Sequence, residues 1–239
     1  VTGSPAIERF TGPQIRRFYQ TEPALYNRTA RVHLVSSFLC SILCGADVPV
    51  DHGDAAGMNL MNLETLDWDP DIAEATAPGL IDKLPPIRHS ASRAGTLCDY
   101  FARYGLRPGV PVICWSGDNP NSLVGTGAAR LGTATISLGT SDTFFAAMDQ
   151  PVTDPDGYGH VFGNPAGNYM SLICFKNGSL AREAVKNRCD IDWEYFDGGA
   201  FEDTSPGNQG NLMLPYFEPE ITPKVLAPGI RRRGSRQFC

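Results

Sequence analysis

The segment VPVICWSGDNP, residues 110–120, predicts a short buried strand that ends in a polar turn. An apolar run of this length, bounded by turn residues, is typical of a strand buried within a sheet. Asp118 follows Gly117 directly at the end of this strand. Because ligands of open α/β sheets bind outside the carboxyl ends of the strands, Asp118 is a candidate base for a substrate hydroxyl. From the spacing alone, an ordinary turn whose Asp or Asn caps the next helix is the alternative.

Helices and strands alternate on both sides of this segment, which predicts an α/β or mixed fold. Thr11 is expected to cap the first helix and Gly45 to end the second. Residues 51–57 are small and polar and are expected to form a loop. Helices are predicted at residues 11–20, 36–44, 71–77, 97–104, 121–129 and 179–186. Strands are predicted at residues 31–35, 58–63, 110–115, 133–138, 143–147, 169–175 and 211–217.

A second candidate site lies in the turn that joins the predicted strands at 133–138 and 143–147. This turn contains Gly139, Thr140 and Ser141, a glycine followed by two hydroxyl side chains. Backbone N–H and hydroxyl groups in a tight turn can bind an anion, as phosphate-binding nests do. An ordinary hairpin with polar turn residues is the alternative interpretation.

Composition and charge exclude several classes of protein. The chain has 239 residues, of which 42% are hydrophobic, enough for a core in one large domain or two incomplete ones. Its net charge of −6 opposes binding to the phosphate backbone of nucleic acids. No stretch reaches the roughly 20 apolar residues of a membrane span, and no basic-then-apolar leader is seen. The cluster Arg231–Arg233 is expected to be a solvated tail.

The seven cysteines lack the paired spacings of zinc sites. They are expected to be thiols in a reducing compartment, which predicts a cytoplasmic protein without a protein-bound metal. The sequence contains no P-loop, dinucleotide-binding fingerprint, nucleophile elbow or HExxH motif. Nucleotide binding through one of these common motifs is therefore excluded.

Seven segments together resemble the FGGY carbohydrate kinases, the sugar kinases that include xylulose, gluconate and glycerol kinases. The chain is most similar to the xylulose kinases of eukaryotes, and the resemblance covers Ile7 to about Arg232. The segments follow the order of the family: ERFTGPQI at 8–15, LVSSF at 34–38, DAAGMNL at 54–60, SGDNP at 116–120, SLGTSDT at 137–143, CFKNGSL at 174–180 and EITP at 220–223.

The resemblance implies a two-lobed fold of the ribonuclease-H-like or actin-like type, with the active site between the lobes. Residues 1–108 would form the C-terminal part of the first, sugar-binding lobe. Residues 109–239 would form the N-terminal part of the second, nucleotide-binding lobe. The implied reaction transfers the γ-phosphoryl group of ATP to the 5-hydroxyl of D-xylulose and gives xylulose 5-phosphate, a step of xylose catabolism.

The resemblance also implies roles for individual residues. Asp118 matches the catalytic base, and Arg9, Asp118 and Asn119 match residues that contact the sugar. Residues 139–141 match the turn that approaches the phosphates of ATP, which Mg²⁺ would bridge. The implied partners are D-xylulose and ATP, with a homodimer as a further expectation and with neither nucleic acid nor membrane.

The chain departs from the complete family sequences, which are considerably longer. The first phosphate-binding loop and the Gly-Gly adenine segment of the family are missing from it, and residues 233–239 no longer resemble the family. We therefore expect this chain by itself to be inactive as a kinase. Two alternatives stay open, another FGGY kinase of the ribulose, gluconate or glycerol type, and a non-catalytic remnant that binds sugar.

Overall fold

The computed structural model describes residues 1–234, apart from the side chain of Ala200. Residues 233–239 are the segment predicted to no longer resemble the family. The last five of them lie outside the described residues. The α-helices are α1 (Thr11–Thr21), α2 (Pro23–Arg28), α3 (Val35–Cys44), α4 (His52–Gly57), α5 (Pro70–Thr76), α6 (Asp118–Gly125), α7 (Ser179–Arg188) and α8 (Trp193–Glu202). The short 3₁₀ helices are η1 (Leu80–Lys83), η2 (Asp99–Tyr104) and η3 (Asn208–Gly210).

The strands are interspersed with these helices in a mixed order, and four of them follow one another between α6 and α7. They are β1 (Val50–Asp51), β2 (Met61–Asn62), β3 (Asp67–Trp68), β4 (Ile87–Arg88), β5 (Arg93–Thr96), β6 (Pro111–Ile113), β7 (Ala134–Leu138), β8 (Asp142–Met148), β9 (His160–Gly163), β10 (Tyr169–Phe175), β11 (Leu212–Tyr216) and β12 (Gly229–Arg233). The predicted hairpin is confirmed, because β7 and β8 are neighbours in one sheet and only residues 139–141 separate them.

Contacts within the chain group its residues into two compact units. The first unit contains residues 1–135 and 145–172, and the second contains residues 136–144 and the described residues from 173 onward. The predicted division after residue 108 concerns the lobes of a complete kinase, and it stays a prediction.

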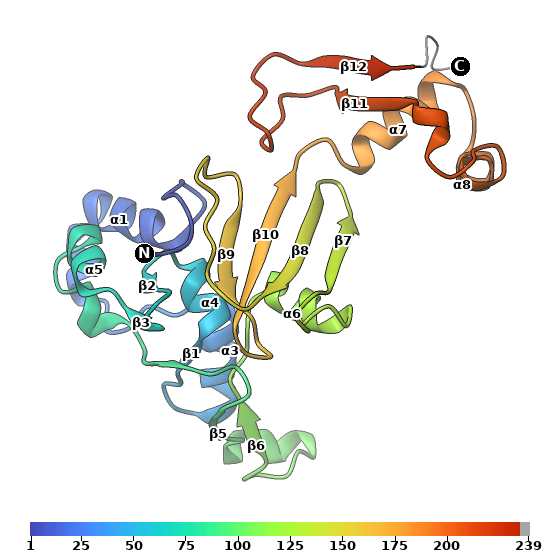
Figure 1. Cartoon of the computed structure of the whole chain (residues 1–239). Helices are drawn as coiled ribbons and strands as arrows, with labels where there is room; N and C mark the ends of the chain where they lie inside the picture. The colour runs from blue at the N-terminus through green and yellow to red at the C-terminus, as the bar shows by residue number, and fades with distance from the viewer. Residues whose placement is uncertain (235–239) are drawn as a thin grey trace. The chain divides into compact units, whose positions relative to one another are not determined.

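A four-stranded sheet has the order β7-β8-β10-β9 (Figure 1). β9 and β10 pair antiparallel, with His160 opposite Leu172 and Gly163 opposite Tyr169. The other strands form two-stranded pairs, β1 with β4, β2 with β3, β5 with β6 and β11 with β12. β1 and β4 run parallel, with Asp51 opposite Arg88. Asp51 therefore ends a buried strand at the point where α4 begins.

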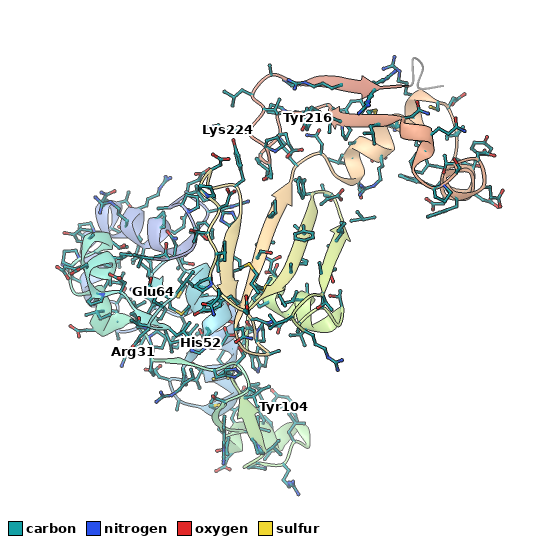
Figure 2. The ribbon with its side chains drawn as sticks, viewed as in Figure 1. Arg31, His52, Glu64, Tyr104, Tyr216 and Lys224 are labelled. Carbon is teal, nitrogen blue, oxygen red and sulfur yellow. The ribbon has the colours of Figure 1, made fainter. Side chains whose placement is uncertain are left out.

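The first unit has a core of large apolar side chains. Two of its aromatic side chains also form hydrogen bonds, because Tyr26 Oη donates to Pro78 O and Trp68 Nε1 donates to Pro85 O. α4 packs against β9 (Figure 1). A Cβ atom on Gly163 would lie 2.6 Å from the backbone carbon of His52, the first residue of α4, which Figure 2 labels. Only glycine allows this approach, so β9 fixes the position of α4.

The loop predicted at residues 51–57 is wrong, and the error bears on the candidate site. These residues form α4, because the side chain of Asp51 accepts a hydrogen bond from Asp54 N and caps the helix. Gly53, Ala55 and Ala56 are buried in this helix. Small residues suggested a loop, but here they let a helix approach its neighbours closely.

Other local predictions also need correction. Residues 31–34 form no strand, since Val32 N donates to Lys83 O rather than to a partner strand. Phe10, and not Thr11, is the N-cap of α1, whereas Gly45 ends α3 as predicted, with φ of 68°. The helix predicted at 97–104 is the 3₁₀ helix η2, and the helix predicted to reach residue 129 ends at Gly125.

The arginine cluster Arg231–Arg233 is part of a sheet rather than a free tail. It lies in β12, which pairs antiparallel with β11 so that Arg232 is opposite Met213. The arginine side chains are nevertheless exposed, as the sequence predicts. Among the described helices, none combines the length and the apolar character needed to cross a membrane.

Candidate active site

Asp118 is the first residue of α6 and directly follows the turn after β6. Its side chain is exposed, and its Oδ1 accepts a hydrogen bond from Asn119 N at 2.8 Å. Gly117 is the N-cap of α6, and no side chain caps this helix. The alternative in which Asp or Asn serves as the N-cap is therefore wrong. A carboxylate in the first turn of a helix is stabilised by the helix dipole.

The turn before Asp118 is held from behind by α4. A Cβ atom on Gly53 would lie 2.6 Å from Ser116 Oγ, and a Cβ atom on Gly117 would lie 2.5 Å from Asp54 Oδ1. Asn121 Nδ2 closes the turn from the other side by donating to Ser116 O at 2.9 Å. Glycine is therefore needed on both sides of this contact between α4 and the turn.

Asp54 and Asp51 form a buried pair of carboxyl groups behind the turn. Asp54 accepts a hydrogen bond from Ser36 Oγ, and Asp51 accepts one from Ser90 Oγ at 2.5 Å. Burial, with a smaller contribution from the neighbouring charges of Asp51 and Asp118, raises the pKa of Asp54 to about 7 against the opposing effect of the Ser36 hydrogen bond. Asp54 therefore changes its charge near neutral pH.

Arg9 lies in the same unit, next to His160 of β9. Arg9 Nη2 is 3.4 Å from His160 Nε2. His160 is buried, with its ring edge-on to Phe10 at 5.2 Å and stacked with Phe162 at 6.3 Å. Burial and the charge of Arg9 hold the pKa of His160 below its usual value. The imidazole is therefore neutral, and its Nε2 can accept a hydrogen bond from the exposed guanidinium group.

A pocket of about 390 Å³ lies beside the Ser116 turn. Its lining is mainly apolar: Ser90, Ala91, Ile113, Cys114, Trp115, Ser116, Asn121, Val124, Pro165 and Ala166. Asp118, Asn119 and Arg9 do not line it. The candidate site thus lies on the exposed side of the turn, and this pocket is a separate feature of the first unit.

The predicted phosphate-binding turn, residues 139–141, belongs to the second unit. It lies against the start of α7, where Ser179 N donates to Gly139 O at 2.7 Å. A Cβ atom on Gly178 would lie 2.7 Å from Thr140 O and from Asp142 N. The segment SLGTSDT therefore packs directly on the segment CFKNGSL, and the glycine of the second segment makes this approach possible.

Two polar contacts fix these segments further. Arg182 donates to both carboxylate oxygens of Asp142 and also to Ser179 Oγ. The buried carboxylate of Glu220 accepts hydrogen bonds from the backbone N–H groups of Lys176 and Asn177. Burial alone would raise the pKa of Glu220, but hydrogen bonds from the Asn177 side chain and from these backbone groups hold it below its usual value. Glu220 therefore joins the segment EITP to CFKNGSL as a carboxylate.

The sequence identified the exposed residues of the candidate site but missed the buried ones. Asp118 and Asn119 are adjacent on α6, Arg9 lies in the same unit, and residues 139–141 lie in the other unit. Ser36, Asp54 and His160 were not predicted to take part. Ser36 and Asp54 lie in two of the segments that carry the family resemblance. Their place in these segments was the feature of the sequence that could have indicated a role in the site. Within residues 1–234, no group of three or more His, Cys, Asp or Glu side chains could hold a metal ion.

Proteins of known identity are similar to this chain over nearly its whole length. Xylulose kinase 2 of Arabidopsis thaliana is 44% identical over 94% of this chain, and the xylulose kinase of Mus musculus is 41% identical over 95%. The chain spans 40% of the plant protein and 41% of the mouse protein.

Solved structures share the fold. The xylulose kinase from Bifidobacterium adolescentis matches with a TM-score of 0.81 at 24% identity, over 98% of this chain and 51% of that chain. Plasmodium falciparum glycerol kinase with ADP matches with a TM-score of 0.79 at 18% identity, over 98% of this chain and 48% of that chain. These similarities confirm the predicted ribonuclease-H-like, actin-like fold of the sugar kinases.

The family assignment follows from the sequence. Residues 1–125, more than half of the chain, match the N-terminal domain of the FGGY family of carbohydrate kinases. The quoted segments around Arg9, Ser36, Asp54 and Asp118 all lie within this match. The chain therefore belongs to the FGGY family of carbohydrate kinases.

Proposed function

We propose that this chain is part of an ATP-dependent kinase that phosphorylates the 5-hydroxyl of D-xylulose. The observation that carries the proposal is the exposed carboxylate of Asp118 in the first turn of α6, in a chain 44% identical to a xylulose kinase. The chain covers only 40% of that relative, so the activity belongs to the complete protein.

Asp118 is proposed as the general base. It would accept the proton of the 5-hydroxyl while that oxygen attacks the γ-phosphorus of ATP. The bond from the γ-phosphorus to the bridging oxygen breaks, and ADP leaves. Positioning and neutralisation of charge supply most of the catalysis in phosphoryl transfer. The base therefore matters most for the timing of proton removal from the sugar.

Arg9 and Asn119 are proposed to bind oxygens of the sugar. The exposed guanidinium of Arg9 keeps N–H donors available beyond its contact with His160. Residues 139–141 are proposed to bind the phosphates of ATP through backbone N–H and hydroxyl groups. We also propose that Mg²⁺ bridges the phosphates of ATP. Cys40 and Cys114 are buried free thiols, whereas Cys189 forms a disulfide, so the prediction that all seven cysteines are thiols is wrong. We propose a cytoplasmic location, and we further propose a homodimer.

The test is an ADP-release assay on the complete protein that contains this chain. D-xylulose is compared with ribulose, gluconate and glycerol as acceptors, and Asp118→Asn is the matched variant. We expect D-xylulose to be the best substrate, with turnover reduced about 100- to 10,000-fold in the variant, as for the loss of a general base. Turnover that is faster with another acceptor, or unchanged in the variant, would overturn the proposal.

A further inference from the structure

Asp54 is a buried carboxyl group placed where three separate segments of the chain meet. Its own segment is α4, Ser36 comes from α3, and Gly117 comes from the turn before α6. Only 8% of the residue is exposed. A buried carboxyl group is costly unless it is hydrogen-bonded or neutralised, so its position behind the Asp118 turn needs a reason.

The carboxyl group is fixed on both sides. Ser36 Oγ donates to Oδ2, and Oδ1 lies against Gly117, where a Cβ atom would be 2.5 Å away. The backbone of Asp54 is fixed as well, because its N–H donates to Asp51 Oδ1 at 2.8 Å. Gly117 directly precedes Asp118. The carboxyl group of Asp54 is therefore in direct contact with the backbone that carries the candidate base.

We propose, resting on the proposed kinase function, that Asp54 is a positioning residue for Asp118, which it holds through Gly117 and influences through its charge. Ser36 serves this role by orienting the carboxyl group of Asp54. Asp54 itself does not touch the substrate.

The charge of Asp54 depends on pH in the physiological range. Burial raises its pKa to about 7, with Asp51 and Asp118 contributing. Above neutral pH, Asp54 adds a negative charge behind Asp118, and a nearby negative charge favours the protonated form of a carboxylate. Transfer of the hydroxyl proton to Asp118 is then easier.

Other groups that titrate or carry charge lie on the elements packed against α4. Asp51 precedes the helix, and His52 is its first residue. Arg88 lies on β4, and His160 lies on β9. The pKa values of both histidines are lowered, mainly by burial. A titration near neutral pH must therefore be assigned by variants rather than by its midpoint.

The first experiment follows the backbone amide signals of Gly117 and Asn119 by NMR across pH 5.5–8.5 in the 239-residue chain. We expect one titration step near neutral pH. The step should vanish in Asp54→Asn and persist in Asp118→Asn, which removes the candidate base and keeps the buried acid. Ser36→Ala is a second variant that keeps the carboxyl group. It should move the step to higher pH, because the Ser36 bond favours the charged form.

The second experiment measures the pH profile of kcat/KM for the complete protein. Between pH 6 and pH 8 the ionised fraction of a group with a pKa of about 7 rises about tenfold. We expect a rise of up to about tenfold in the wild type and a flat profile for Asp54→Asn over this range.

The outcomes separate this proposal from the kinase proposal. The positioning role would be overturned if the amide titration were the same in the wild type, Asp54→Asn and Ser36→Ala. It would also be overturned if Asp54→Asn left the pH profile of kcat/KM unchanged. An intact amide response in a complete protein that phosphorylates no sugar would instead overturn only the kinase function. If Asp54→Asn does not fold, Ser36→Ala still tests the proposal. A titration step that moves to higher pH in this variant supports the positioning role, and a step that does not move overturns it.

Discussion

Arg182 donates hydrogen bonds to both carboxylate oxygens of Asp142, and each N···O distance is 2.8 Å. This two-pronged contact joins α7 to the first residue of β8, directly after the predicted phosphate-binding turn. Two parallel charge-assisted bonds fix orientation as well as distance. The turn therefore has a defined position relative to the start of α7 before any ligand arrives.

Replacing Arg182 should loosen the predicted phosphate-binding turn. We expect Arg182→Met to lower the free energy of unfolding by about 1–2 kcal/mol, since the pair is partly exposed and so partly screened by solvent. In the complete protein, KM for ATP should rise about fivefold or more while KM for D-xylulose stays unchanged, because about 1 kcal/mol of binding energy is about fivefold in affinity. Arg182→Lys is the control, because it keeps the positive charge but cannot form the two parallel hydrogen bonds to Asp142. Equal effects on both KM values would contradict this role.

Gly178→Ala should disturb the same turn sterically. The new Cβ atom would meet Thr140 O and Asp142 N at 2.7 Å, and neither backbone atom can rotate away. We expect a loss of about 1–3 kcal/mol in the free energy of unfolding, as for overpacking elsewhere. Gly198→Ala is the matched control, because it lies in α8 with nothing within 4 Å of its Cβ position. Chemical denaturation of the wild type, Gly178→Ala and Gly198→Ala measures the difference in free energy of unfolding. If the two variants were equally stable, the steric role of Gly178 would be refuted.

Asp54 should make the protein less stable as the pH rises from 4 to 7. Its ordinary pKa is 3.8, and burial raises the value in the folded chain to about 7. Between these values the folded chain holds one proton more than the unfolded chain. The free energy of unfolding therefore falls with rising pH, by up to about 1.4 kcal/mol per pH unit from this group.

Asp54→Asn should remove this slope. The difference in free energy of unfolding between the variant and the wild type, measured in urea at several pH values, should grow in favour of the variant from pH 4 to pH 7. Glu64→Gln removes an exposed carboxyl group (Figure 2) and is the control for the loss of one negative charge. A difference that stays constant over this range would rule out a titrating Asp54.

His160 should affect binding of the sugar through Arg9. His160→Phe removes the acceptor at Nε2 that lies 3.4 Å from the guanidinium group, while His160→Gln can still offer an acceptor. We expect the phenylalanine variant to raise KM for D-xylulose about tenfold, the effect of about 1.4 kcal/mol, and to leave KM for ATP unchanged. Glutamine should restore much of the loss. A phenylalanine variant with normal sugar binding would show that Arg9 needs no support from β9.

The turns that carry the candidate residues could be predicted from the sequence, whereas the roles of these residues came from the family resemblance. Gly117-Asp118 and residues 139–141 each follow an apolar run, and a turn after a strand is a local property of the chain. The strand before Asp118 was only partly correct. β6 covers Pro111–Ile113 and pairs with β5 alone, so the side chain of Ile113 is exposed.

The buried part of the site could not be predicted, because it depends on contacts between distant segments. Residues 51–57 suggested a loop by composition, yet residues 52–57 form a helix that Asp51 caps and that packs against β9. No local pattern shows that Ser36 meets Asp54, or that His160 meets Arg9 across 151 positions of sequence. Resemblance to the family pointed to the segments but not to their contacts.

The contact of Ser36, Asp54 and Gly117 has a consequence for folding. It joins three separate segments of the chain, and closing the loops between such segments costs conformational entropy. The position of the candidate base thus depends on the closure of these loops as well as on the local turn. A chain that has collapsed without this contact keeps Asp118 in its sequence but lacks the geometry to use it. Correct folding and catalytic competence would then be acquired together.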